Sequence, residues 1–202
     1  MSETPCKVQK LDLSNAVSIQ HVEVDTISEI RKLQLDSYMK LYAPYATDSE
    51  TSAFIHTLES AKFAEEVNRN INRRQIFGAF LDDRMIGIAA WSVSRDNHAL
   101  SRLRFLCVDP MFTRCKVGQT LLKTLEQAVK DRHNRELSIR TAVQTMGFFE
   151  KSSYATTSYG AYPLGKDEAF AAAFMRKSIE DSQKITDGSI EKNTPLISTL
   201  HH

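Results

Sequence analysis

The stretch Leu106-Cys-Val-Asp-Pro-Met-Phe-Thr-Arg-Cys-Lys-Val-Gly-Gln-Thr-Leu-Leu122 joins a strand-like run to an amphipathic run through a short loop. Pro110 ends the strand, because proline has no N–H to donate to a sheet ladder. A helix is expected over 117–129, and one of its faces carries Leu121, Leu122, Leu125 and Val129. The free N–H groups of its first turn, beside Arg114 and Lys116, favour negative charge. The stretch therefore indicates a phosphate or pyrophosphate site.

Strand and helix patterns alternate irregularly around this junction. Apolar–polar alternation and short apolar runs bounded by turn residues predict strands at 17–24, 75–81, 85–93, 99–108, 137–143 and 154–162. Helical spacing predicts helices at 27–42, 47–72, 117–129 and 145–152. The run 169–177 is open, because its three consecutive alanines favour helix whereas its position after a strand favours a closing hairpin.

This mixed order of elements favours an α+β fold in which helices cover one twisted sheet. A doubly wound fold would alternate strands and helices throughout. The glycine-rich patterns GxGxxG and GxxxxGK[ST] do not occur in the chain, so the common nucleotide loops are absent.

Composition indicates one globular domain. The 202 residues are 42% hydrophobic and 25% charged, and the formal net charge of +1 argues against a dedicated nucleic-acid partner. We expect an extension at 1–14, the domain at 15–178 and a polar tail at 179–202. Cys6, Cys107 and Cys115 lack the paired spacing of zinc or disulfide motifs, so no metal is expected. With no long apolar run and no signal-like start, we expect a cytoplasmic protein without membrane contact.

Three segments in order resemble the GNAT superfamily of N-acyltransferases. Val108-Asp-Pro110, Gly118 and Leu121-Leu122 resemble its strand ending in V-x-P, its loop [RQ]-x-x-G-x-[GA] and its helix start. Gly147-Phe-Phe-Glu-Lys-Ser-Ser-Tyr154 resembles G-F-Y-E-K-x-G-F, and Phe174-Met-Arg-Lys resembles the last strand of many members. The likeness covers about residues 15–178. It implies a single mixed, mostly antiparallel sheet of about seven strands, with a strand at 169–177.

The resemblance also implies a site for acetyl-CoA as acyl donor and a primary amine as acceptor. A strand edge would pair with the pantetheine arm, loop amides would hold the pyrophosphate, and a backbone N–H would polarise the thioester carbonyl. The residues implied at the cofactor are Leu106, Cys107, Val108, Thr113, Arg114, Cys115, Lys116, Val117, Gly118, Gln119, Thr120 and Phe149.

Four residues depart from the family pattern. Thr113 replaces an Arg or Gln, Lys116 replaces the first loop glycine, and Ala142 stands where Asn is frequent. If the backbone needs a positive φ at Lys116, that residue is penalised by about a kcal/mol or more. Phe149 replaces the tyrosine that often protonates the leaving thiolate, so that role is vacant. Two interpretations therefore stay open: an N-acetyltransferase, and a non-catalytic GNAT-like module that binds CoA or regulates a partner.

Candidates for proton transfer are His98, Tyr154 and Glu150, each with a structural alternative. His98 precedes a strand, Tyr154 fits a core position, and Glu150 fits an exposed helix face. Tyr38 and Tyr42 lie where family members wall the acceptor site, although an aromatic stripe at helical spacing is more often core. Many relatives dimerise through sheet edges or late strands, so a homodimer is a further expectation.

Overall fold

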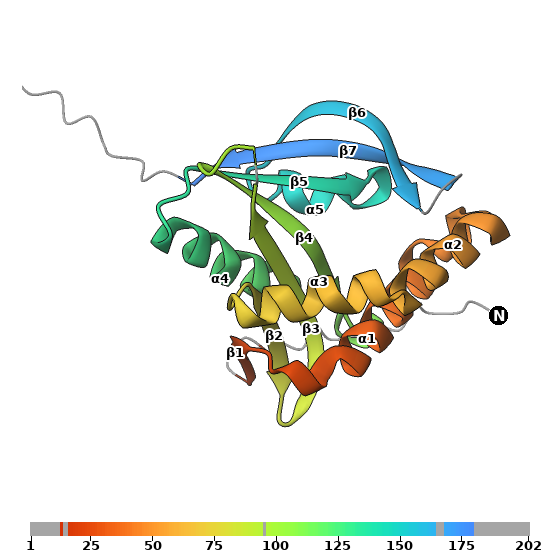
Figure 1. Ribbon diagram of the computed structural model, residues 1–202, viewed down its shortest axis with the longest axis horizontal. Helices are drawn as coiled ribbons and strands as arrows, with labels where there is room; N and C mark the ends of the chain where they lie inside the picture. Colours follow the sequence, from red (N-terminus) through yellow and green to blue (C-terminus); the bar gives the residue numbers. More distant parts are fainter. Residues whose placement is uncertain (1–12, 14–15, 95, 165–167, 180–202) are drawn as a thin grey trace, which may run out of the picture.

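The computed structural model describes residues 13, 16–94, 96–164 and 168–179. Its seven strands form one sheet in the order β1-β2-β3-β4-β5-β7-β6 (Figure 1). Only β4 and β5 run parallel, and every other neighbouring pair is antiparallel. The prediction of a mixed, mostly antiparallel sheet flanked by helices is confirmed. Apart from Leu13 and Ile179, the predicted extension and tail lie outside the described residues.

The elements follow the predicted order closely. Their bounds are β1 Val17–His21, α1 Ile27–Leu41, α2 Asp48–Glu59, α3 Ala61–Asn72, β2 Ile76–Leu81, β3 Arg84–Val93, β4 Leu100–Val108, α4 Val117–Asp131, β5 Glu136–Ala142, α5 Met146–Glu150, β6 Ala155–Leu164 and β7 Glu168–Ser178. The alanine-rich run lies in β7 and pairs with both β5 and β6. Tertiary pairing therefore overrides the helix propensity of its alanines.

The single helix predicted over 47–72 is wrong, because the structure divides it into α2 and α3. Ser60 between them is extended (φ −64°, ψ 148°), and its hydroxyl accepts a hydrogen bond from the Phe63 N–H at 3.2 Å. A serine cap offers the backbone an alternative to helix continuation. The predicted start is right: Thr47 and Glu50 form a capping box at the beginning of α2.

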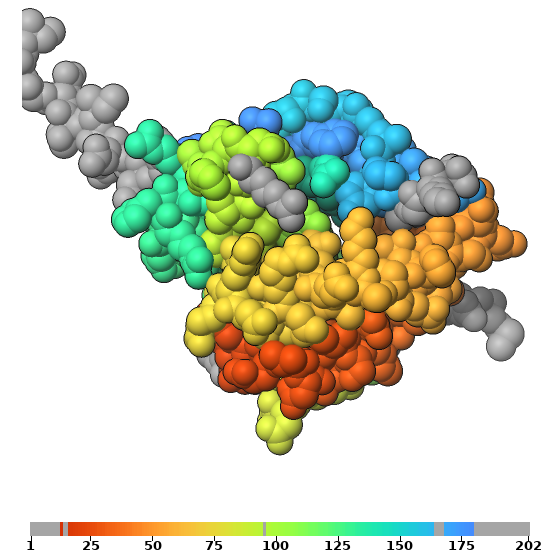
Figure 2. Space-filling model, in the orientation of Figure 1, coloured from red at the N-terminus to blue at the C-terminus, as the bar shows by residue number. Residues whose placement is uncertain are grey.

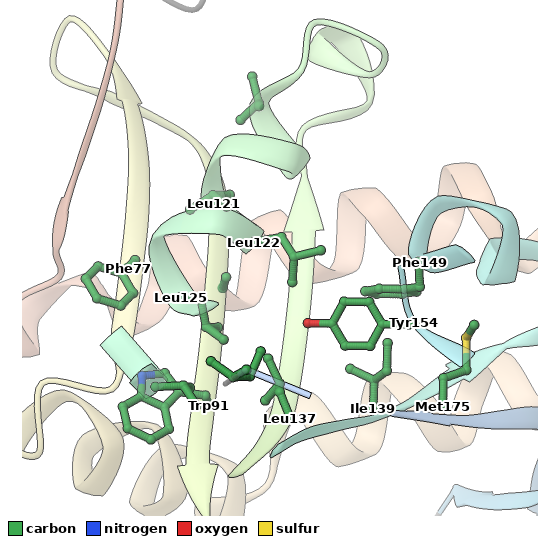
Figure 3. Close-up of a cluster of buried hydrophobic side chains, with 14 of the residues drawn as sticks. Phe77, Trp91, Leu121, Leu122, Leu125, Leu137, Ile139, Phe149, Tyr154 and Met175 are labelled. Carbon is green, nitrogen blue, oxygen red and sulfur yellow. The ribbon is translucent and has the colours of Figure 1, made fainter. Parts of the chain in front are cut away.

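Helices cover both faces of the sheet. On one face, α4 packs Leu121, Leu122 and Leu125 against Phe77, Trp91 and Leu137 (Figure 3). On the other face, α1 and α3 bury Ile30, Leu33 and Val67 against β2 and β3. Strand β3 lies between the two layers and is buried continuously from Met85 to Trp91. Such a run is typical of a strand covered on both sides.

Candidate functional site

Strands β4 and β5 separate soon after they meet. They pair only through Leu100–Arg102 and Glu136–Ser138, although β4 continues to Val108 and β5 to Ala142. Figure 1 shows the two strands diverging beyond that contact. Within the described residues, the edge of β4 that faces β5 therefore has no strand partner from Leu103 to Val108. We call this gap the β4–β5 opening.

A β-bulge lies where the opening begins. In the pairing of β3 with β4, Ala90 is opposite Phe105 and Trp91 is opposite Leu103, which leaves Arg104 without a partner residue. A bulge bends its strand and increases the local twist. The bulge thus gives a physical reason for β4 to leave β5 just after Arg102.

Side chains at the end of β4 point to opposite faces. Leu106 and Val108 pack with the core beneath α4, whereas Cys107 lies with the cluster beneath α1 and α3. The thiol of Cys107 is hydrogen-bonded to Ser37 of α1, and its burial raises the pKa from 9.0 to about 12. At these three positions the free edge therefore offers backbone N–H and C=O groups, with the side chains turned to either side.

The loop after β4 is held by local contacts. The Asp109 carboxylate accepts from the Met111 N–H at 2.9 Å and forms an ion pair with Arg84. The Thr113 hydroxyl donates to the Pro110 carbonyl at 3.0 Å, and the Cys115 thiol contacts the Thr113 carbonyl at 3.7 Å. Thr113 thus closes the turn, in place of the longer side chain that the family pattern has there.

Arg114 and Lys116 lie in the left-handed region, with φ 65° and 64°. For a residue with a Cβ this conformation costs about 1–2 kcal/mol. Lys116 is the N-cap of α4, no side chain caps the helix there, and the first turn holds no acidic residue. The N–H groups of Val117, Gly118 and Gln119 therefore face the loop, and the helix dipole favours an anion beside them. The Thr120 hydroxyl already donates a hydrogen bond to the Lys116 carbonyl at 3.2 Å.

Phe149 and Tyr154 both belong to the core next to α4. The Phe149 ring meets Phe148 and Tyr154 edge-on, at centroid distances of 4.9 and 5.8 Å. The Tyr154 hydroxyl donates to Glu126 of α4 at 2.8 Å, and Lys177 bonds the other oxygen of that carboxylate at 2.8 Å. Burial first, and then the charge of Glu126, raise the pKa of Tyr154. In Figure 3 the phenol points toward α4. Both observations favour a structural role for Tyr154.

Replacing Tyr154 by phenylalanine should therefore cost stability without changing the site. We expect the free energy of unfolding to fall by about 2 kcal/mol, because a buried hydrogen bond to a charged group is lost. Urea unfolding measures this change. Tyr159→Phe on the exposed part of β6 is the matched control, with no loss expected. An unchanged stability for Tyr154→Phe would contradict the structural role.

His98 lies away from the opening, whereas Glu150 lies in the helix that follows β5. His98 is exposed in the turn before β4, at the opposite end of that strand from the loop 109–116. Glu150 is exposed at the end of α5. The structure therefore does not bring His98, Glu150 and Tyr154 together, and a catalytic role for any of them stays a prediction.

Tyr38 and Tyr42 have different surroundings. Tyr38 is buried and stacks on Phe54 of α2 at 3.9 Å. Tyr42 is half-buried, and its hydroxyl donates to Thr145 at 3.4 Å, so it reaches the end of β5. Sequence reasoning missed Thr145. The only local signal is its position four residues after Thr141, a spacing that brings the two hydroxyls within 2.5 Å.

The sequence matches a family model, the Acetyltransferase (GNAT) domain, over residues 42–162. This is more than half of the chain, so the protein belongs to the GNAT acetyltransferase family. Its class is that of the acyltransferases that depend on acetyl-CoA. Among curated proteins, the comparison found no match.

Solved structures show the same fold. A GCN5-related N-acetyltransferase from Rhodopseudomonas palustris matches with a TM-score of 0.70 and 19% identity, over 81% of this chain and 96% of that chain. The PaiA N-acetyltransferase from Thermoplasma acidophilum, in complex with coenzyme A, matches with a TM-score of 0.63 and 19% identity. The match covers 80% of this chain and 98% of that chain. A ribosomal-protein-alanine N-acetyltransferase from Brucella melitensis matches with a TM-score of 0.62 and 15% identity, over 80% of this chain and 99% of that chain.

The described residues contain neither a metal-binding cluster nor a membrane-spanning helix. No group of three or more His, Cys, Asp or Glu side chains is arranged to hold a metal ion. No helix in this part of the chain has the length and apolar character that crossing a membrane requires.

Proposed function

We propose that the protein transfers an acetyl group from acetyl-CoA directly to a primary amine, on a small molecule or at a peptide end. The observation that carries this proposal is the β4–β5 opening, whose free edge leads into an uncapped helix start flanked by Arg114 and Lys116. The free strand edge suits an amide-containing arm, and the helix start suits a pyrophosphate. The two are adjacent along one stretch of chain.

The residues present fit the two parts of the donor. The edge at Leu106, Cys107 and Val108 would pair with the amides of a pantetheine arm, in the way that a peptide adds to a sheet edge. The amides from Arg114 to Gly118 would hold the pyrophosphate, with Gln119 next to them. Arg114 and Lys116 add positive charge near the phosphates. This charge would offset part of the affinity lost because Thr113 and Lys116 replace the family's Arg or Gln and its first loop glycine.

When bound, acetyl-CoA supplies an activated acyl thioester. A backbone N–H on the free edge of β4 would stabilise the negative charge that develops on the carbonyl oxygen. The amine then attacks without a covalent enzyme intermediate. The acceptor class includes peptide ends, and one structural neighbour is named for acetylating an alanine of a ribosomal protein.

Thermal unfolding with and without acetyl-CoA tests the proposal, with CoA and ATP as comparison ligands. At about 100 times its dissociation constant, a ligand stabilises the folded state by about 2.7 kcal/mol. A protein of this length should then melt a few degrees higher. We expect a shift with acetyl-CoA and CoA and little with ATP, followed by turnover in an amine screen. No shift at millimolar acetyl-CoA, with the protein folded, would overturn the proposal.

The second candidate is a non-catalytic GNAT-like module, and the buried phenylalanine at position 149 favours it, since that ring has no proton to give. Specific binding of CoA without turnover of any amine would support this candidate. A homodimer, a cytoplasmic location and the absence of a nucleic-acid partner stay predictions. Strand β6 lies at the edge of the sheet and would be the natural contact between two copies.

A further inference from the structure

The ring of Tyr42 is fixed at the point where α1 ends. Its N–H donates to the Tyr38 carbonyl at 2.8 Å, which closes the last turn of the helix. Its ring stacks on Tyr38 at 5.9 Å, and Tyr38 in turn stacks on Phe54 at 3.9 Å. Figure 2 shows this layer of helices beside the β6–β7 hairpin. Packing from two helices thus determines where the Tyr42 hydroxyl lies.

That hydroxyl meets a group of threonine hydroxyls at the end of β5. Thr145 donates to the Ala142 carbonyl at 2.9 Å, so its oxygen accepts from its neighbours. Thr141 lies 2.5 Å from it, whereas Tyr42 lies 3.4 Å from it. A separation of 3.4 Å is long for an O–H···O bond. The hydrogen bond from Tyr42 to Thr145 is therefore weak, and the phenol O–H can turn to a closer acceptor.

The helix that ends beside Tyr42 also packs against β4, where the Cys107 thiol is hydrogen-bonded to Ser37 of α1. Burial first raises the pKa of Tyr42, the hydrogen bond with Thr145 lowers it, and the charge of Cys107 raises it further. Helix α1 packs on β4 and the Tyr42 hydroxyl contacts Thr145 just after β5, so Tyr42 links the helix layer to both strands that border the opening. It keeps its proton at neutral pH.

Tyr42 was predicted only for the acceptor site, and none of the three residues predicted for proton transfer forms a hydrogen bond with these hydroxyls in the described part of the chain. Phe149 has no hydroxyl, and the Tyr154 hydroxyl donates its hydrogen bond to Glu126 on the α4 side. The side chains of His98 and Glu150 are exposed to solvent. Within the described residues, Tyr42 is thus the candidate whose hydroxyl lies at the opening, on the face opposite α4.

We propose that Tyr42 is the proton relay of acyl transfer. It reaches the reacting atoms from the α1 side and takes the role of the tyrosine that Phe149 replaces. This inference rests on the proposed function. As the bond from the amine nitrogen to the carbonyl carbon forms and the carbon–sulfur bond breaks, Tyr42 gives its proton to the sulfur. It takes up the proton that the nitrogen releases. The amine enters in its neutral form, after losing one proton to water; amide and thiol then leave, and the phenol is restored.

Tyr42→Phe tests the relay, because the ring and its stacking on Tyr38 are kept while the proton is removed. General acid–base assistance contributes about 10²–10⁴-fold. We expect kcat to fall at least about 100-fold, with the KM for acetyl-CoA and the melting temperature unchanged. Tyr45→Phe is the matched control, since Tyr45 is 73% exposed three residues further on, and it should keep wild-type rates. A kcat within about threefold of wild type, or a change confined to the KM for the amine, would overturn the relay.

A second readout needs no acceptor amine. A hydroxyl that donates to the sulfur stabilises its thiolate, so CoA bound to the wild-type protein should ionise at lower pH than CoA bound to Tyr42→Phe. The ultraviolet absorbance of the thiolate follows this titration. Identical titrations would overturn the inference even if the transferase is active. Failure of the wild-type protein to bind CoA would overturn the proposed function, and this inference with it.

Discussion

Replacing Leu125 by alanine is expected to lower the free energy of unfolding by about 3–5 kcal/mol, the upper range for a buried leucine. Leu125 has no exposed surface and lies on α4 in the same buried cluster as Trp91 and Leu137 (Figure 3). Removing its branched end leaves a cavity that helix and sheet, fixed by Leu121 and Val129 on either side, can only partly close. A domain with a total stability of about 5–15 kcal/mol would lose much of it.

Urea unfolding of purified Leu125→Ala measures this loss. Leu41→Ala is the control, because Leu41 is 38% exposed at the end of α1 and its truncation should cost about 0.5 kcal/mol or less. Acetyl-CoA at about 100 times its dissociation constant should restore about 2.7 kcal/mol, since it binds only the folded state. A loss below about 1 kcal/mol would show that α4 does not pack on the sheet as described.

The junction around α4 could be predicted from sequence because its signals are local. Strand β4 ends at Val108, two residues before Pro110, and the spacing of the leucines marks the buried face of α4. The left-handed backbone of Lys116 was expected only by comparison with a family pattern that has glycine there. The break at Ser60 was missed because apolar residues continue at helical spacing across it. Whether one helix or two form there depends on the hydrogen bond by which Ser60 caps α3.

Features that depend on tertiary contact could not be predicted. Tyr42 and Thr145 are 103 residues apart, and nothing in either segment indicates that they meet. Tyr154 is 28 residues from Glu126, so the sequence indicated a core position for its ring but not the hydrogen bond that holds its hydroxyl. The β4–β5 opening was expected only from the family resemblance, because the bulge at Arg104 and the end of the parallel pairing cannot be read from a single sequence.

Cys107 should make the protein lose stability in alkali. Burial raises the pKa of its thiol from 9.0 to about 12, so the unfolded chain releases this proton first. A raised folded-state pKa gives a contribution that is complete below pH 9 and is lost as the pH rises. The three-unit difference corresponds to about 4 kcal/mol by pH 12. The raised pKa values of Tyr42 and Tyr154 act in the same direction from about pH 10 upward.

Between pH 9 and 10 the thiol should therefore dominate, and urea unfolding at pH 8, 9 and 10 can isolate it. The wild-type protein should lose about 1 kcal/mol across the last unit, whereas Cys107→Ala should lose little. Comparing slopes rather than absolute values removes the cost of the smaller side chain. Ser37→Ala is the matched variant: it deletes a hydrogen bond that lowers the thiol pKa, so its stability should keep falling to a higher pH than in wild type. Equal slopes for wild type and Cys107→Ala would show that the thiol is not held in the interior beneath α1.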